Sequence, residues 1–156
     1  MQTDAPSSRR AVVDVQSQTI TVFEGDDAEL ARFPVSTSKF GLGSEEGSLR
    51  TPMGEFAVAE KVGDGAERGT VFKSRKPEGT WDGTPCEEDM VLTRILWLDG
   101  QEPHNANAKD RYIYIHGTNQ EELIGTPASI GCVRMKNADV EELFAMLEVG
   151  DEVRIG

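Results

Sequence analysis

The side chains best suited to chemistry are His116 and Cys132, which stand sixteen positions apart along the chain. His116 ends the alternating run Arg111-Tyr-Ile-Tyr-Ile, and Cys132 directly follows a glycine. A thiol becomes a strong nucleophile when a nearby imidazole takes its proton. A histidine at a strand end and a cysteine in a loop therefore suit covalent acyl transfer, and they predict a low pKa for Cys132.

Gly131 strengthens this interpretation, because a glycine lets the backbone turn tightly before the nucleophile. Such a turn would bring the Cys132 amide close to a developing oxyanion. The alternative is structural, since a cysteine is often only a small buried apolar side chain. The pairing of His116 with the Gly-Cys turn favours chemistry.

Two stretches resemble the signature of a known family. Ile115-His116-Gly117-Thr118 and Ser129-Ile-Gly131-Cys132-Val-Arg134-Met are similar to the His-Gly and Ser-His-Gly-Cys-Ile/Val-Arg motifs of the YkuD-type L,D-transpeptidase catalytic domain. Thr51-Pro-Met-Gly-Glu-Phe56 is similar to a Thr-Pro-x-Gly-x-Phe motif that precedes a strand near the cleft of that family. One position departs, because Ile130 stands where the pattern has a second histidine.

The resemblance implies catalytic roles for four residues. Cys132 would be the nucleophile and His116 the base that takes its proton and returns it to the leaving amine. The carbonyl of Gly117 would orient the histidine through its other ring nitrogen. The amides of Gly131 and Cys132 are the candidates for the oxyanion site.

Four further residues are candidates for substrate binding. Arg134 could bind a substrate carboxylate through two hydrogen bonds, or form a structural salt bridge. Arg94 could point into the cleft toward a carboxylate, or extend outward from its strand. Ser129 could bind the substrate or shape the loop, and Thr118 adjoins the His-Gly pair.

The resemblance also implies a substrate, the tetrapeptide stem of peptidoglycan, cut between the L-centre of a diamino acid and a terminal D-alanine. We expect an L,D-carboxypeptidase that trims recycled muropeptides. The alternatives are an L,D-transpeptidase that forms cross-links, a non-catalytic binding domain on the same fold, and a secreted structural domain with a Cys86–Cys132 disulfide.

Composition limits the other possibilities. The formal net charge of -12 disfavours nucleic acid and anionic membranes as partners. No apolar run is long enough for a membrane span, and residues 1–9 predict a flexible leader without a secretory signal. We therefore expect a cytoplasmic monomer, or a periplasmic or cell-wall protein if the start was trimmed.

Metal and redox chemistry have little support in the sequence. The chain has two histidines, His104 and His116, and lacks the Cys-x-x-Cys and His-Glu-x-x-His patterns. We expect no metal and no cofactor. Of the two cysteines, we expect Cys132 to react and Cys86 to be a bystander with a free thiol.

The elements that must position these residues are mainly strands. Pro34 indicates an edge strand or an irregularity in its strand. Asn137 is expected to cap a helix whose apolar residues recur at helical spacing, at Val140, Leu143, Phe144 and Leu147. Residues 10–156 thus predict one mainly β domain, a YkuD-like sandwich or partial barrel with one C-terminal helix packed on the sheets. Alternating and apolar runs predict about seven strands, at 11–15, 20–23, 30–35, 56–59, 90–98, 111–115 and 152–155, with a shorter candidate at 71–75.

Overall fold

A computed structural model describes residues 9–25 and 28–156 of the chain. Its strands form one continuous sheet in the order β3-β2-β1-β10-β4-β7-β5-β6, and β8 pairs with both β7 and β9. The strands are β1 Arg9–Asp14, β2 Thr19–Glu24, β3 Ala28–Pro34, β4 Gly54–Val62, β5 Thr70–Lys73, β6 Lys76–Thr80, β7 Leu92–Gly100, β8 Tyr114–Gly117, β9 Val133–Met135 and β10 Glu152–Ile155.

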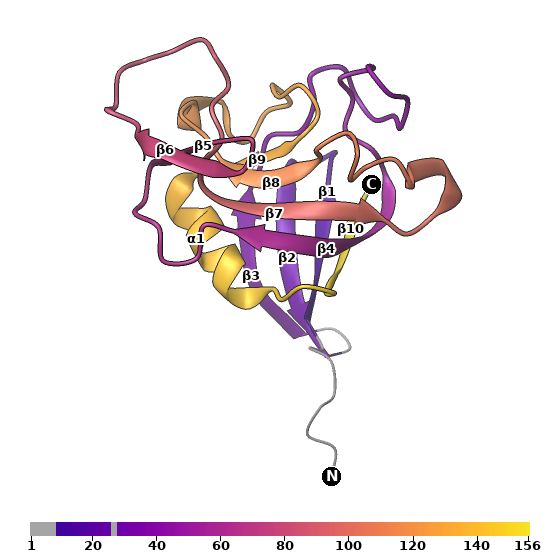
Figure 1. The fold of residues 1–156 in the computed structure, drawn as a ribbon. Helices are drawn as coiled ribbons and strands as arrows, with labels where there is room; N and C mark the ends of the chain where they lie inside the picture. Colours follow the sequence, from indigo (N-terminus) through magenta and orange to yellow (C-terminus); the bar gives the residue numbers. More distant parts are fainter. Residues whose placement is uncertain (1–8, 26–27) are drawn as a thin grey trace.

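The sheet curls into two layers (Figure 1). The strands β1, β2, β3 and β10 run across the direction of β4, β7 and β8, and the helix α1, Asn137–Met146, packs beside both sets. This arrangement confirms the predicted mainly β fold with one C-terminal helix. It differs in one respect, because the two layers belong to a single ten-stranded sheet.

The first two strands, predicted at 11–15 and 20–23, pair as a hairpin. Ala11 pairs with Val22 and Val13 pairs with Ile20 in antiparallel register, and all four side chains are buried. Alternation places every second residue on the core face, as the sequence pattern requires. β3 lies at the edge of the sheet and ends at Pro34, as its proline predicted.

The main core fills the space between the layers and α1. Val140, Leu143, Phe144 and Leu147 are buried against the sheet, which confirms the predicted apolar stripe. The predicted cap is wrong, because Lys136 precedes the helix and Asn137 is its first residue. Asn137 instead uses its side-chain amide within the sheet-to-helix junction, as described below.

Several element boundaries differ from the prediction. β6, whose residues are all exposed, and β9 lie where no strand was predicted, and β6 pairs with β5 as a hairpin. β8 begins at Tyr114, since residues 106–112 form turns. Arg9, assigned to the leader, is the first residue of β1, and the rest of the predicted leader lies outside the described residues. Within the described part of the chain, no helix is long and apolar enough to cross a membrane.

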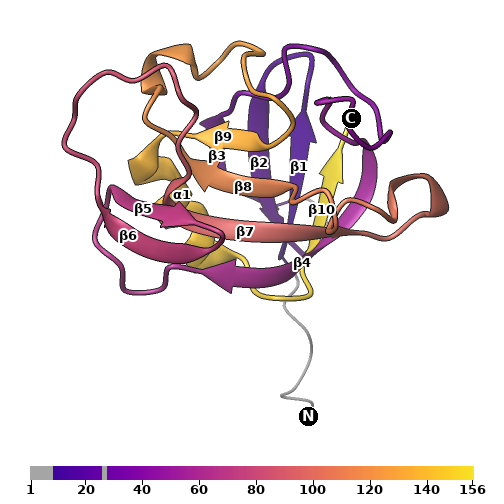
Figure 2. The ribbon, with the colours of Figure 1, turned by 45° about the horizontal axis from the view of Figure 1, so that its top comes forward.

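The strands β7, β8 and β9 lie side by side in the layer that contains β4, which we call the second layer (Figure 2). β8 contains His116, and β9 begins directly after Cys132. β8 pairs antiparallel with β7 and parallel with β9. Ile115 and Val133 are paired and face the main core. Residues one position away therefore face the opposite side, where a second apolar cluster forms from Phe72, Ile95, Trp97 and Tyr114.

Candidate active site

His116 is fixed inside the second layer. It lies between Ile95 of β7 and Arg134 of β9 in register, and it is 1% exposed. Its Nδ1 is 2.6 Å from the carbonyl oxygen of Gly117. Because a carbonyl oxygen only accepts, Nδ1 carries the proton and Nε2 carries the lone pair. The histidine therefore has the tautomer that a general base needs.

Gly117 has a steric role as well. A Cβ atom at this position would lie 2.4 Å from the Asn137 Oδ1 atom and 2.7 Å from the Leu92 carbonyl oxygen. The same Asn137 oxygen accepts a hydrogen bond from Thr93, and its amide nitrogen donates to the Thr118 carbonyl oxygen at 2.8 Å. Only a glycine lets the start of α1 approach the end of β8 this closely.

Cys132 directly precedes β9 on the same face of the sheet. Continuing the β8–β9 register places Cys132 beside Tyr114, two positions from the His116–Arg134 pair. The Tyr114 amide lies 3.3 Å from Sγ, and the thiol donates to the Tyr112 carbonyl oxygen at 3.3 Å. The parallel pairing thus brings the predicted nucleophile and base to diagonal positions on one face.

The turn before Cys132 is held by hydrogen bonds inside the loop. Gly131 has φ +136°, a conformation that favours glycine, and no other residue crowds its Cβ position within 3.5 Å. Ser129 Oγ donates to the Cys132 carbonyl oxygen at 2.7 Å and accepts from the Gly131 amide at 3.3 Å. The buried Ser129 hydroxyl is therefore used in shaping the loop, and the Gly131 amide already has a partner.

Thr51, the first residue of the Thr-Pro-x-Gly motif, fastens this loop from a distant part of the chain. Its hydroxyl donates to the Gly131 carbonyl oxygen at 2.9 Å and accepts from the Ser38 amide at 2.9 Å. Thr51 is fully buried. Its motif pointed to the cleft, but its contact with the Cys132 loop joins residues 80 positions apart and has no local signal.

Arg134 lies beneath the site, with a side chain that is 1% exposed. Its Nη1 donates to Asp89 at 3.0 Å and to Gln120 at 2.6 Å. Within residues 9–25 and 28–156, its Nε and Nη2 atoms have no hydrogen-bond partner. Asp89, which no sequence motif singled out, supplies the carboxylate that pairs with Arg134. Thr118 also lies here, with its hydroxyl 3.5 Å from Asp89.

The surroundings favour the neutral forms of both candidate groups, the His116 imidazole and the Cys132 thiol. Burial lowers the pKa of His116, and Arg134 lowers it further, while Asp89 and the Gly117 carbonyl oppose them. Burial raises the pKa of Cys132 to about 12, although the Tyr114 amide and the nearby arginine charges oppose this. The predicted low pKa of Cys132 is therefore wrong for the free protein, because desolvation outweighs the charges around the thiol.

A hollow of about 360 Å³ opens beside Cys132. Ile130, in the place of the family's second histidine, is 52% exposed at its wall. Arg111 also lines it and donates to the carbonyl oxygens of Arg50 and Gly43, which ties two loops together. The remaining lining residues are Glu46, Gly47, Leu49, Asp110, Tyr112, Ile113 and Gly131.

Arg94 does not join this site. Its Nη1 donates to the carbonyl oxygens of Ala66 and Thr93, and its guanidinium lies 5.5 Å from the Phe144 ring centroid of α1. It lines a separate hollow with Lys61 and Asp64. The structure therefore places it on the helix side and not beside the thiol. Cys86 is exposed and is not bonded to Cys132.

Sequence comparison finds relatives in Bacillus. A proposed L,D-transpeptidase, YqjB of Bacillus subtilis (strain 168), is 36% identical over 106 residues, which are 67% of this chain and 51% of YqjB. A proposed L,D-transpeptidase, YkuD of Bacillus licheniformis, is 26% identical over 94% of this chain and 64% of its own length. The chain thus spans about half to two thirds of these relatives.

Solved structures share the fold at low identity. The L,D-transpeptidase LdtMt1 in complex with imipenem is 21% identical with a TM-score of 0.60, covering 96% of this chain and 59% of that one. Bd1075 of Bdellovibrio bacteriovorus is 16% identical with a TM-score of 0.63, covering 99% of this chain and 50% of that one.

The model of one family matches nearly all of the chain. Its description is the L,D-transpeptidase catalytic domain, and the match runs from residue 8 to residue 155. His116, Cys132 and the loops around them all lie inside this range. By this match the chain belongs to the YkuD family of L,D-transpeptidase catalytic domains.

Proposed function

We propose that this domain transfers acyl groups from peptidoglycan stem peptides through a thioester on Cys132. The observation that carries the proposal is the β8–β9 pairing, which sets Cys132 and His116 on one face with the Nε2 lone pair unprotonated. A neutral imidazole is the form that can accept the thiol proton. The family membership supports a peptidoglycan substrate.

In the first half-reaction, Sγ attacks the carbonyl carbon between the diamino acid and D-alanine as His116 takes the thiol proton. The C–N bond then breaks, and the imidazolium returns that proton to the leaving amine. The Cys132 amide is our donor for the oxyanion, and the Gly131 amide would have to leave Ser129 to join it. Since the free thiol is neutral, proton transfer belongs to the attack itself.

Arg134 is our candidate for the substrate carboxylate. Its Nε and Nη2 atoms, which have no partner among the described residues, support this role, because a buried donor without a partner costs free energy that a carboxylate would recover. Its burial sets a condition. The carboxylate can reach it only if Asp89 and Gln120, which hold Nη1, shift.

In the second half-reaction, water or an amine attacks the thioester. We propose water as the acceptor, which makes the domain an L,D-carboxypeptidase that releases D-alanine from muropeptides. An amine acceptor, which would give a cross-link, is the second candidate. It is favoured by the relatives and solved structures that carry the name L,D-transpeptidase.

Mass spectrometry of a purified disaccharide-tetrapeptide tests the proposal. The wild-type protein is expected to remove one alanine, Cys132→Ala to remove none, and Cys86→Ala, the matched control at an exposed thiol, to act like wild type. Dimers that depend on Cys132 would support the amine acceptor. No product from the wild-type protein, together with measurable binding, would instead support a binding domain.

A further inference from the structure

Tyr112 combines a strained backbone with an exposed ring. Its backbone has φ 59°, a left-handed conformation that is unfavourable for a bulky residue. Its side chain is nevertheless 54% exposed, so burial of the ring does not explain the conformation. Non-glycine residues held in this way cluster at functional sites. The Tyr112 carbonyl oxygen also accepts a hydrogen bond from the Cys132 thiol.

The ring of Tyr112 rests on a supported stack. It lies over Trp97 with centroids 5.9 Å apart and planes 29° apart. Trp97 meets Tyr114 edge to face at 5.7 Å, and its Nε1 donates to the Lys109 carbonyl oxygen at 3.1 Å. Trp97 and Tyr114 are buried, while Tyr112 presents its ring to solvent. These three rings, which we call the aromatic platform, are therefore fixed before any ligand arrives.

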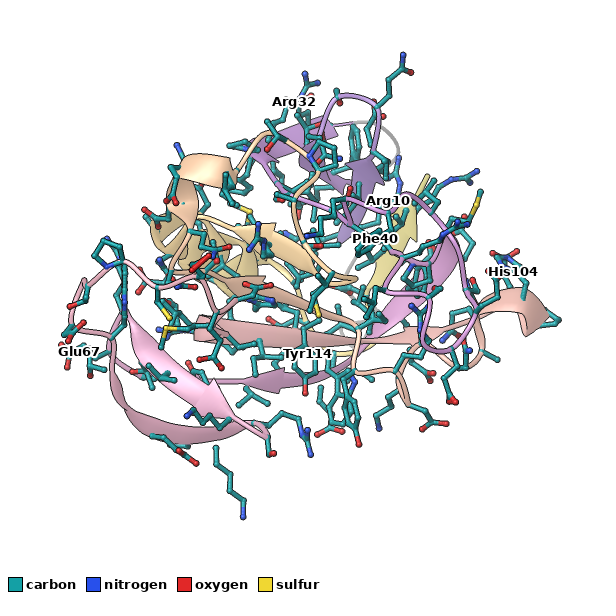
Figure 3. The ribbon with its side chains drawn as sticks, turned by 90° about the horizontal axis from the view of Figure 1, so that it is seen from above. Arg10, Arg32, Phe40, Glu67, His104 and Tyr114 are labelled. Atoms are coloured by element: carbon teal, nitrogen blue, oxygen red, sulfur yellow. The ribbon has the colours of Figure 1, made fainter. Side chains whose placement is uncertain are left out.

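Charged side chains flank the aromatic platform. The Arg75 guanidinium lies 4.6 Å from the Trp97 ring centroid and 5.4 Å from that of Tyr112, and Nη1 donates to the Tyr114 hydroxyl at 3.1 Å. Lys109 lies 5.0 Å from the Trp97 ring and pairs with Glu60. The platform thus offers an apolar face with hydrogen-bonding groups at its rim. Figure 3 labels Tyr114, its inner ring.

We propose that the aromatic platform binds the sugar that a stem peptide carries, with a pyranose ring packed on Tyr112. A pyranose has an apolar face of C–H groups and a rim of hydroxyls. Such a ring matches a fixed aromatic face flanked by donors and acceptors, which Tyr112 offers through one apolar face and one polar end. This inference rests on the proposed function, since it assigns another part of the same substrate.

The location of Tyr112 supports the sugar over a more distant group. Tyr112 lines the hollow beside Cys132, so the platform is continuous with the reacting centre. An extended peptide of three residues spans about 10 Å. That is the separation between the scissile carbonyl of a stem peptide and the sugar at its other end. The Tyr112 carbonyl oxygen lies 3.3 Å from Sγ, so a peptide of this length can reach from the thioester to the ring at the far end of the same residue's side chain.

Binding measured without turnover tests the platform separately from the reaction. Cys132→Ser keeps an O–H donor for the Tyr112 carbonyl oxygen, and calorimetry compares its affinity for disaccharide-tetrapeptide and for free tetrapeptide. We expect roughly three- to tenfold tighter binding of the sugar-bearing ligand, the range that one aromatic contact supplies. The measured quantity is the ratio of two affinities of one protein, so a partial loss of folded protein cancels.

Substitutions in this background assign the ratio to the ring. Tyr112→Ala is expected to reduce it to about one, because the contact is lost, and Tyr112→Phe is expected to keep it. Leu30→Ala, which truncates an exposed apolar residue on β3, is the matched control and should keep it too. Equal affinity for the two ligands, no binding of either, or a ratio that survives Tyr112→Ala would each overturn the platform.

The reaction itself is judged on wild-type turnover. Absence of D-alanine release with a sugar-dependent affinity intact would count against the proposed function alone. Release of D-alanine at equal efficiency from both ligands, without any affinity difference, would count against the platform alone.

Discussion

The two halves of the active site are built differently. His116 is buried in a strand, with neighbours on both sides and the Gly117–Asn137 junction beneath it. Cys132 leaves a turn, next to a hollow whose walls include the exposed Ile130 and Tyr112. The proposed base is thus fixed by the fold, and the proposed nucleophile borders the hollow. A site of this kind separates proton handling, which needs a rigid dry environment, from recognition, which needs access.

The strongest test of the buried half of the site replaces His116, the proposed base. His116→Gln keeps an amide that can donate to the Gly117 carbonyl oxygen, but it cannot take a proton. We expect kcat/KM for D-alanine release to fall by roughly 100- to 10,000-fold, the usual contribution of general acid–base catalysis. Circular dichroism checks that the variant is folded. A loss of less than about tenfold would mean that His116 is not the base.

The open half is tested by alkylation of its thiol. Since burial raises the pKa of Cys132 to about 12, little thiolate is present at pH 7 in the free protein. Alkylation of Cys132 by iodoacetamide should therefore rise about tenfold for each pH unit from 7 to 9, without a plateau. Peptide mass spectrometry separates it from the exposed Cys86. A plateau below pH 8 would indicate a thiolate that His116 has already formed.

Asp89→Asn removes the ion pair between Asp89 and Arg134, the residue that lies beside His116 in the sheet. Removing one partner of a buried pair leaves Arg134 uncompensated, and we expect about 3 kcal/mol lower free energy of unfolding in urea. Glu87→Gln, at an exposed acid of the same loop, is the matched control and should change stability by less than about 0.5 kcal/mol. Equal stability of the two variants would show that the ion pair is not needed.

Asp89→Asn is also expected to shift the pH profile of kcat/KM in a definite direction. Asp89 raises the pKa of His116 against the lowering by burial, so its loss lowers that pKa further. The acidic limb of kcat/KM should therefore move to lower pH in Asp89→Asn. For wild type, the buried neutral histidine stabilises the fold above about pH 6.5, and this contribution is lost as the pH falls below it. An acidic limb that moves to higher pH in Asp89→Asn would contradict the assignment of that limb to His116.

Two glycine substitutions compare the halves directly. Gly117→Ala inserts a Cβ against the Leu92 backbone, and we expect a loss of about 3 kcal/mol from overpacking. Gly131→Ala places a Cβ in ordinary van der Waals contact, 3.7 Å from the Arg50 carbonyl oxygen, so only its φ of +136° is costly, at about 1 to 2 kcal/mol. Urea unfolding measures both. The reverse order would mean that the Cys132 turn, and not the base, is the more tightly packed half.

The smallest effect is expected at Ile130, the position where this chain departs from the family's pattern. Ile130→His restores the second histidine at a half-exposed position, so stability should change by less than about 0.5 kcal/mol. With His116 as the base, kcat/KM should change by less than about tenfold. A much larger gain in rate would show that a second imidazole takes part in the reaction.

Local patterns predicted much of this molecule. The N-terminal hairpin and the apolar stripe of α1 follow from side-chain periodicity alone. The strand at His116 was predicted only in part, because residues 111–113 lie outside β8 and His116 lies inside it. The Gly-Cys turn also followed from residue type. Residue type also suggested the pairing of His116 with Cys132, and the resemblance to the family added their roles as base and nucleophile.

The partners of these residues could not be predicted, because they come from distant loops. Asp89 reaches Arg134 across 45 positions, and Thr51 reaches Gly131 across 80. Neither contact leaves a periodic signal. The pKa of Cys132 was mispredicted for the same reason, since desolvation depends on which segments cover the thiol. Arg94 was placed with the candidates because its strand was clear, while the face it would use was not.

The place of β10 in the sheet has a consequence for biosynthesis. β10 lies between β1, with which it is parallel, and β4, with which it is antiparallel, so residues 152–155 join the N-terminal hairpin to the rest of the sheet. Until the ribosome has released these residues, β1 and β4 expose unpaired edges to other chains. The N-terminal hairpin can then join the rest of the sheet only after residues 152–155 have emerged, when the first and last strands meet.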